Sequence, residues 1–175
     1  MEKIAVSFLI VLGGFLIARF LIVPSLVLHE LGHLLAAKVR GIPIHGFYIG
    51  SGRGLLEFRF LNISWVFKRD MSSGEIRVPR LIPKSQAGWN SILILALAGP
   101  ATNLVLGTAA ALTFFSADHW AIKILAAGML FVNYDMVKKS SCDYMLARVA
   151  RDKNLEGLQS MHLTGENAPP VMEIG

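Results

Sequence analysis

The sequence predicts a mainly α-helical membrane protein, with three transmembrane helices and a small membrane-associated antiparallel β-sheet between the first two. Of its 175 residues, 54% are hydrophobic and 17% are charged, whereas about 25% are charged in an ordinary soluble domain. Charged residues are absent from long stretches, of which residues 85–117 are the longest. Since about 20 helical residues cross the ~30 Å core of a bilayer, these stretches indicate membrane spans. They exclude a simple soluble enzyme and a disordered chain.

The first predicted span covers residues 4–39. A continuous helix of this length would be roughly 50 Å long, which is more than a bilayer core requires. Arg19 and Pro24 interrupt the apolar run, but no turn-forming residues surround Arg19. We therefore expect one tilted helix with a kink near Pro24, rather than a hairpin of two spans. Gly41 and Pro43 supply the signal that ends it.

Short stretches of alternating apolar and polar residues fill residues 42–84. Turn-forming residues separate them at 50–54, 61–62 and 70–74. The pattern predicts three or four short strands in a small antiparallel sheet. The aromatic and basic content of this segment suits a sheet that lies against a membrane surface.

Two further spans are predicted over residues 88–115 and 120–137, followed by an amphipathic helix over about 143–158. We expect residues 1–160 to form a single core, because the length allows one compact unit and little else. Residues 161–175 are expected to form a flexible tail.

The distribution of Lys and Arg predicts the orientation of these spans. Fourteen of the cations lie in residues 38–84 and 138–153, whereas the opposite flanks hold only Lys3 and Lys123. Positive residues concentrate on the cytoplasmic side of membrane proteins. The sheet and the C-terminus are therefore expected in the cytoplasm and the N-terminus outside, and the basic excess does not indicate nucleic-acid binding.

The first span contains the sequence His29-Glu30-Leu31-Gly32-His33, which has the H-E-x-x-H spacing of a zinc site. Residues i and i+4 share one helix face, so both imidazoles can reach one metal ion. Glu30 can then activate a zinc-bound water. A carboxylate within a membrane span costs at least ~2.5 kcal/mol. This cost favours a functional role over the alternative, in which the histidines are buried and satisfied by neighbouring helices.

The second span contains Gly99-Pro100-Ala101-Thr102-Asn103. Gly and Pro can open a helix locally, and the Asn103 amide could then hold a substrate carbonyl or stabilise an oxyanion. The alternative is an ordinary kink with a polar residue that bonds between helices.

Catalytic zinc usually takes three protein ligands and one water, so a third ligand is needed. The candidates are His45, Glu57, Asp135, Cys142 and Asp143. His45 and Glu57 fall in the predicted sheet, and a cysteine is the rarer partner for histidine and carboxylate ligands. The residues alone leave Asp135 and Asp143 open, although Asp143 would also suit a helix N-cap.

Together, these motifs resemble the site-2 protease family of intramembrane zinc metalloproteases. The resemblance covers about residues 15–155. Its matching residues are His29, Glu30 and His33, then Gly99-Pro100 with Asn103, and finally Asn133 followed by an aspartate.

The resemblance implies one Zn²⁺ per chain, held by His29, His33 and Asp143, with Glu30 and Asn103 as catalytic residues. The family usually has an Asp-Gly ligand about eight residues after the asparagine. Here no Gly follows Asp143, which lies ten residues after Asn133. We favour Asp143 over Asp135 because Tyr144-Met145-Leu146 then begins a helix, as in the family.

The implied function is an intramembrane zinc endopeptidase that hydrolyses peptide bonds in or near a transmembrane segment of its substrate. The expected partners are the lipid bilayer, a membrane-protein or membrane-proximal peptide substrate and a regulatory membrane partner. The predicted sheet is similar to a hairpin of the family that can pair with substrate backbone. The alternative is a catalytically silent relative that binds client membrane helices, although binding alone would not need Glu30. A metal carrier would need polar residues along a path, and the spans offer few.

Overall fold

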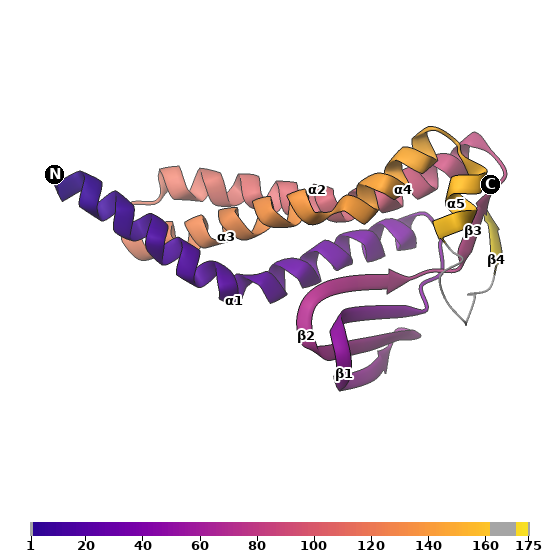
Figure 1. Cartoon of the computed structure of the whole chain (residues 1–175), viewed down its shortest axis with the longest axis horizontal. Coiled ribbons are helices and arrows are strands. Elements are labelled where there is room, and N and C mark those ends of the chain that lie inside the picture. Colours follow the sequence, from indigo (N-terminus) through magenta and orange to yellow (C-terminus); the bar gives the residue numbers. More distant parts are fainter. Residues whose placement is uncertain (1, 162–170, 175) are drawn as a thin grey trace. The chain divides into compact units, whose positions relative to one another are not determined.

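The computed structural model describes residues 2–161 and 171–174 (Figure 1). Its elements in chain order are α1 (Glu2–Val39), β1 (Gly46–Phe60), β2 (Ile63–Arg77), β3 (Arg80–Pro83), α2 (Gln86–Ser116), α3 (Trp120–Lys139), α4 (Ser141–Arg151), α5 (Leu155–Met161) and β4 (Val171–Ile174).

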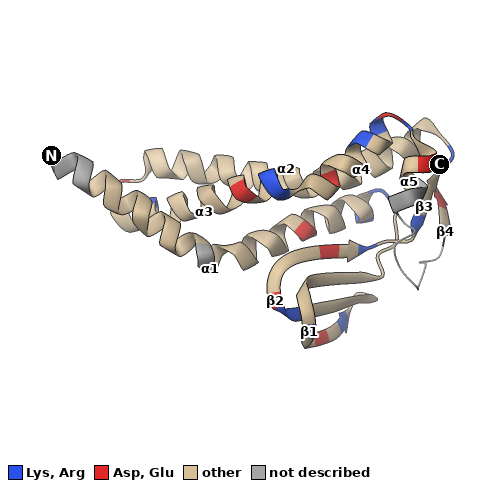
Figure 2. Ribbon diagram, in the orientation of Figure 1, with Lys and Arg blue, Asp and Glu red and all other residues tan. Residues whose placement is uncertain are grey.

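Three helical segments among the described residues are long and apolar enough to cross a membrane. They are Phe20–Val39 within α1 and the whole of α2 and α3. The prediction of three spans is therefore confirmed. The ends of α2 and α3 lie within two residues of the predicted ends of the second and third spans. α2 carries no charged residue over its whole length, as Figure 2 shows. The single first helix is also confirmed, because α1 runs without a break through Pro24.

The chain divides into two compact units, and α1 and α2 each run through the division without a break. The first unit consists of Met1–His29 and Pro100–Ser140. Small residues bring its helices together: a Cβ atom placed on Gly14 would lie only 2.5 Å from Ala127 Cβ. The rings of Phe15 and Phe131 meet edge to face, with 6.4 Å between their centroids.

The second unit consists of Glu30–Gly99 and Ser141–Gly175. Its hydrophobic core joins the C-terminal end of α1 to α2, α4, α5 and the short strands. The buried core residues are Ala37, Ile42, Leu81, Ile92, Leu95, Ala150, Leu158 and Ile174. This packing fixes the part of α1 that carries Glu30 and His33 against the first half of α2.

β1 and β2 form an antiparallel two-stranded sheet, joined by a tight turn at Leu61 and Asn62, both of which have positive φ. This turn was predicted. The other two expected turns are instead bends inside long strands, where Gly50 (φ 93°) allows β1 to change direction. As a result, Phe47 of β1 lies opposite both Trp65 and Ile76 of β2. Two bent strands thus replace the three or four short ones expected.

β4 pairs in parallel with β3, with Leu81 opposite Met172. The backbone N–H of Lys84 donates to the carbonyl of Ile174 over 2.9 Å, which extends the pairing. This strand was not predicted, because Val171–Ile174 falls within the segment expected to be a flexible tail. Residues 162–170 of that segment lie outside the described residues.

The predicted amphipathic helix over 143–158 is wrong in one respect, because it is two helices, α4 and α5. The helical conformation is interrupted between them, where Lys153 has a positive φ of 53°. Asn154 then caps α5, since its Oδ1 accepts a hydrogen bond from the Gly157 backbone over 2.9 Å. An asparagine favours such a cap because its short side chain reaches the unpaired N–H groups of the first turn.

Candidate metal centre

Helix α1 carries three chemically active side chains within two turns. His29, Glu30 and His33 are 7%, 5% and 6% exposed, respectively, and all three fall in the candidate span Phe20–Val39. The four-residue spacing of the two histidines places them on one helix face. Most of the residues around them in α1 are apolar, so the polar stripe of an ordinary surface helix does not explain these three side chains.

His33 makes contacts through both ring nitrogens. Its Nδ1 lies 2.7 Å from the carbonyl oxygen of Leu95 in α2. A carbonyl can only accept a hydrogen bond, so Nδ1 carries a proton, and in the neutral ring Nε2 has the lone pair that a metal would bind. Nε2 in turn lies 3.5 Å from Asp143 Oδ1. This is the arrangement typical of metal-ligating histidines, whose second nitrogen donates to a fixed oxygen.

The two aspartates that the sequence left open lie in different environments. Asp143 is in the first turn of α4, with its side chain 23% exposed, beside His33. Asp135 in α3 is 53% exposed and pairs with Lys139 Nζ at 2.6 Å, one turn along the same helix. The structure thus brings Asp143, and not Asp135, to a histidine of the motif. The remaining candidates, His45, Glu57 and Cys142, have exposed side chains.

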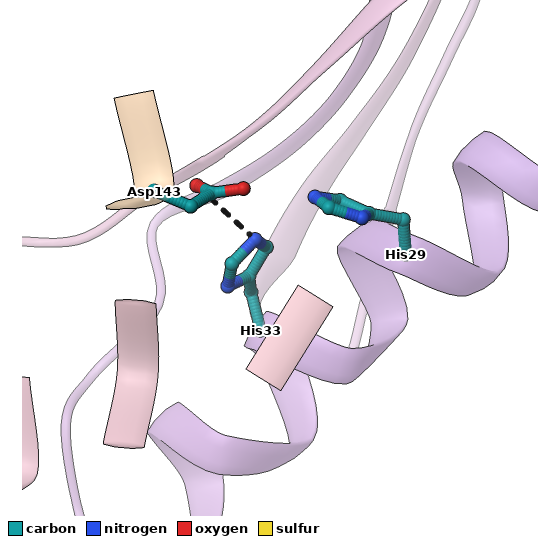
Figure 3. Close-up of side chains that lie close together, drawn as sticks. All are labelled: His29, His33 and Asp143. Atoms are coloured by element: carbon teal, nitrogen blue, oxygen red, sulfur yellow. Dashed lines mark ion pairs between the residues drawn. The ribbon is translucent and has the colours of Figure 1, made fainter. Parts of the chain in front are cut away.

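The ligand atoms of His29, His33 and Asp143 all lie within 4.8 Å of one another (Figure 3). Two ligands on a tetrahedral zinc, with bonds of about 2.0–2.1 Å, lie ~3.3–3.4 Å apart. The 3.5 Å between His33 and Asp143 is close to that spacing. Two neutral imidazoles and one carboxylate are also the ligands of known catalytic zinc sites. The residues therefore fit a zinc ion with one coordination position left open.

Asn103 of α2 is fully buried and lies beside His29. Its Nδ2 is 2.9 Å from His29 Nδ1, and its Oδ1 has no hydrogen-bond partner among the described residues. Asn133 of α3 is also buried, but its Nδ2 donates to the carbonyl of Met129 in its own helix over 2.8 Å. Of the two asparagines in the motif, only Asn103 thus contacts a predicted ligand.

The carboxylate of Glu30 lies against β2 at Gly74. A Cβ atom placed on Gly74 would be 2.5 Å from both Cγ and Oε1 of Glu30. Only a residue without a side chain lets the strand pass so close. Sequence reasoning identified Gly74 as part of a predicted turn and missed this contact. No local signal could have revealed it, since 44 residues separate the two positions in the chain.

Comparison with known proteins adds one finding to this geometry. A family model described as Peptidase family M50 matches residues 15–166. The match includes α1 from Phe15 onward, the sheet, α2, α3 and α4. No curated protein matches the chain.

Proposed function

Since the chain belongs to peptidase family M50, the site-2 protease family, we propose that it is an intramembrane zinc endopeptidase. Its substrates are membrane-embedded or membrane-proximal peptides, cut in or near a transmembrane segment. The observation that carries the proposal is the burial of His29, Glu30 and His33 within a candidate membrane span, with Asp143 next to His33. Buried ionisable groups in a membrane span are costly and mark functional sites.

His29, His33 and Asp143 would hold one Zn²⁺. When bound, the ion supplies a Lewis acid that polarises the peptide carbonyl and lowers the pKa of water. The Leu95 carbonyl fixes the His33 ring by accepting a hydrogen bond from Nδ1 over 2.7 Å. Nε2 is thereby held toward Asp143, 3.5 Å away, so two of the proposed ligand atoms already lie close together.

Glu30 is the general base. Its carboxylate accepts a proton from the attacking water and returns it to the amine that leaves. The backbone of β2 at Gly74 limits where the carboxylate can lie, because the strand passes next to Glu30.

Asn103 serves both His29 and the substrate. If His29 binds zinc through Nε2, its Nδ1 carries the proton and requires an acceptor. A half-turn of the Asn103 amide exchanges Nδ2 and Oδ1, so the oxygen that lacks a partner among the described residues would accept a hydrogen bond from that N–H group. The amide nitrogen is then free to donate to the substrate carbonyl, which is the role the sequence predicted.

The free edge of the sheet offers a place for the substrate backbone. In β1, the segment around Phe47 is paired on both sides, opposite Trp65 and Ile76. The strand segment around Gly74 pairs only with β1 among the described residues, and it passes next to Glu30. An extended peptide added to this edge would lie beside the general base. Strand addition holds a peptide by backbone hydrogen bonds and therefore accepts varied sequences.

We also propose that residues 1–160 act as one catalytic core, with the sheet and C-terminus in the cytoplasm and the N-terminus outside. The fourteen cations in residues 38–84 and 138–153, against two on the other flanks, support this orientation. A regulatory membrane partner is part of the same proposal.

The proposed function is tested by reconstituting the purified protein in liposomes with a model single-span substrate. We expect one zinc per chain, cleavage that a chelator abolishes and Zn²⁺ restores, and product masses that place the cut in or next to the apolar segment. Stoichiometric zinc and tight substrate binding without any product would instead support the client-binding alternative.

A further inference from the structure

An open pocket of about 480 Å³ lies between α2 and α4 in the second unit. Its volume is within the range of about 300–1,000 Å³ that is usual for small-molecule sites. The lining residues are Leu93, Leu97, Tyr144, Ala147, Arg148 and Arg151. The α2 residues are four apart and the α4 residues follow a spacing of three and four. Each helix therefore presents one continuous face to the pocket.

The two faces of this pocket differ in polarity. α2 supplies only leucines to it and has no charged residue over its whole length (Figure 2). The last turn of α4 supplies Arg148 and Arg151, whose side chains are 78% and 70% exposed. A ligand that filled the pocket would have an apolar part against Leu93 and Leu97 and an anionic part near the two guanidinium groups.

The charges near the pocket are compatible with one added anion. Among the residues that the structure describes, Asp152 is the acid that pairs with these arginines, at 2.9 Å from Arg151 and 3.8 Å from Arg148. Exposed pairs of this kind contribute little stability, so a phosphate can compete with the carboxylate. Two guanidinium groups and one carboxylate leave a single positive charge, which a phosphodiester with one negative charge neutralises.

We propose that this pocket binds an anionic glycerophospholipid, with an acyl chain along Leu93 and Leu97 and the phosphate at Arg148 and Arg151. α2 is a candidate membrane span, so its leucine face meets lipid chains wherever no protein covers it. Every lining residue belongs to a helix. The pocket therefore offers no row of unpaired backbone groups to hold an extended peptide, which favours a lipid over a peptide as its occupant.

The proposal is tested by native mass spectrometry of the full chain titrated with phosphatidylglycerol and, separately, phosphatidylcholine. The readout is lipid binding and does not depend on proteolysis. We expect one phosphatidylglycerol to bind at least about tenfold more tightly than phosphatidylcholine. The double variant Arg148→Gln/Arg151→Gln should lose about tenfold or more of this affinity, since each cation near an anionic headgroup contributes about 1 kcal/mol, or roughly fivefold.

Three further variants distinguish binding in the pocket from adsorption to surface charge. Leu97→Trp fills the apolar half without changing charge and should also lose the bound lipid, whereas Leu104→Trp, on the same helix but outside the pocket, should not. Arg53→Gln/Arg59→Gln, an equal loss of charge on exposed β1, should bind as the wild type does. Glycerol phosphate alone should fail to displace the lipid.

Three results would overturn the proposal. Unchanged binding by the Arg148→Gln/Arg151→Gln variant would exclude the headgroup contact. Loss in that variant together with full binding by Leu97→Trp would indicate adsorption to surface charge. Displacement of the lipid by a soluble extended peptide would make the pocket a peptide site.

Discussion

The contact between Gly74 and Glu30 makes the substitution Gly74→Ala a sharp probe of the proposed base. The added Cβ would lie 2.5 Å from Oε1 and Cγ of Glu30, whereas ordinary van der Waals contact begins at 3.4 Å. Either the strand or the carboxylate must therefore move by about 0.9 Å, the difference between these two distances. Gly74 is not one of the described glycines that have a positive φ, so an alanine at this position adds no backbone strain. The effect should come from displacement alone.

A shift of about 1 Å in a catalytic group can cost about 10²-fold in rate, so we expect Gly74→Ala to cleave on the order of 10²-fold more slowly. Zinc content should stay at the wild-type value, because none of the three proposed ligands is touched. The assay compares single-turnover cleavage in liposomes with zinc measured on the same sample. Gly54→Ala is the matched control, since a Cβ there meets nothing within 4 Å. Wild-type rates in zinc-loaded Gly74→Ala would refute the placement of the base beside β2.

Three further predictions address the metal, the topology and the amide. Asp143→Ala should greatly weaken zinc binding and Asp135→Ala should not, as measured by metal content after dialysis; the reverse result would make Asp135 the third ligand. A reporter fused after Gly175 should signal from the cytoplasm and one inserted at Asp118 from the far side, and a C-terminal reporter found outside would contradict the three-span topology. Asn103→Ala should bind zinc about 10–100-fold more weakly and, at saturating zinc, cleave about 10²-fold or more slowly. Unchanged zinc affinity would remove its proposed role on His29.

The helices and the motif could be predicted because their signals are local. The uncharged run of residues 85–117 contains the whole of α2, and four-residue spacing on a helix is enough to bring His29 and His33 to one face. The turn at Leu61 and Asn62 could likewise be predicted, because the stretches of alternating apolar and polar residues end on either side of it. Such features depend on a few adjacent residues, and the surrounding structure does not override them.

The missed features depend on partners far away in the chain. The strand Val171–Ile174 exists through its pairing with β3, about ninety residues earlier, and the Gly, Asn and Pro residues that precede it in the sequence are typical of a loop. The contact of Gly74 with Glu30 arises when β2 folds back over α1. The choice between the two aspartates also required the structure, because both follow the same apolar span. What separates them is that Lys139 pairs with Asp135 at the surface while Asp143 lies next to His33.

The central claim, that Glu30 is the base of a zinc endopeptidase, is tested most directly by cleavage with purified, zinc-loaded Glu30→Gln. Glutamine keeps the size of the side chain and most of its hydrogen bonding but cannot accept a proton from water. The variant should insert, fold and hold one zinc per chain, yet leave the substrate uncut, while Glu57→Gln on the exposed face of β1 cleaves at the wild-type rate. Cleavage by zinc-loaded Glu30→Gln at the wild-type rate would contradict the account.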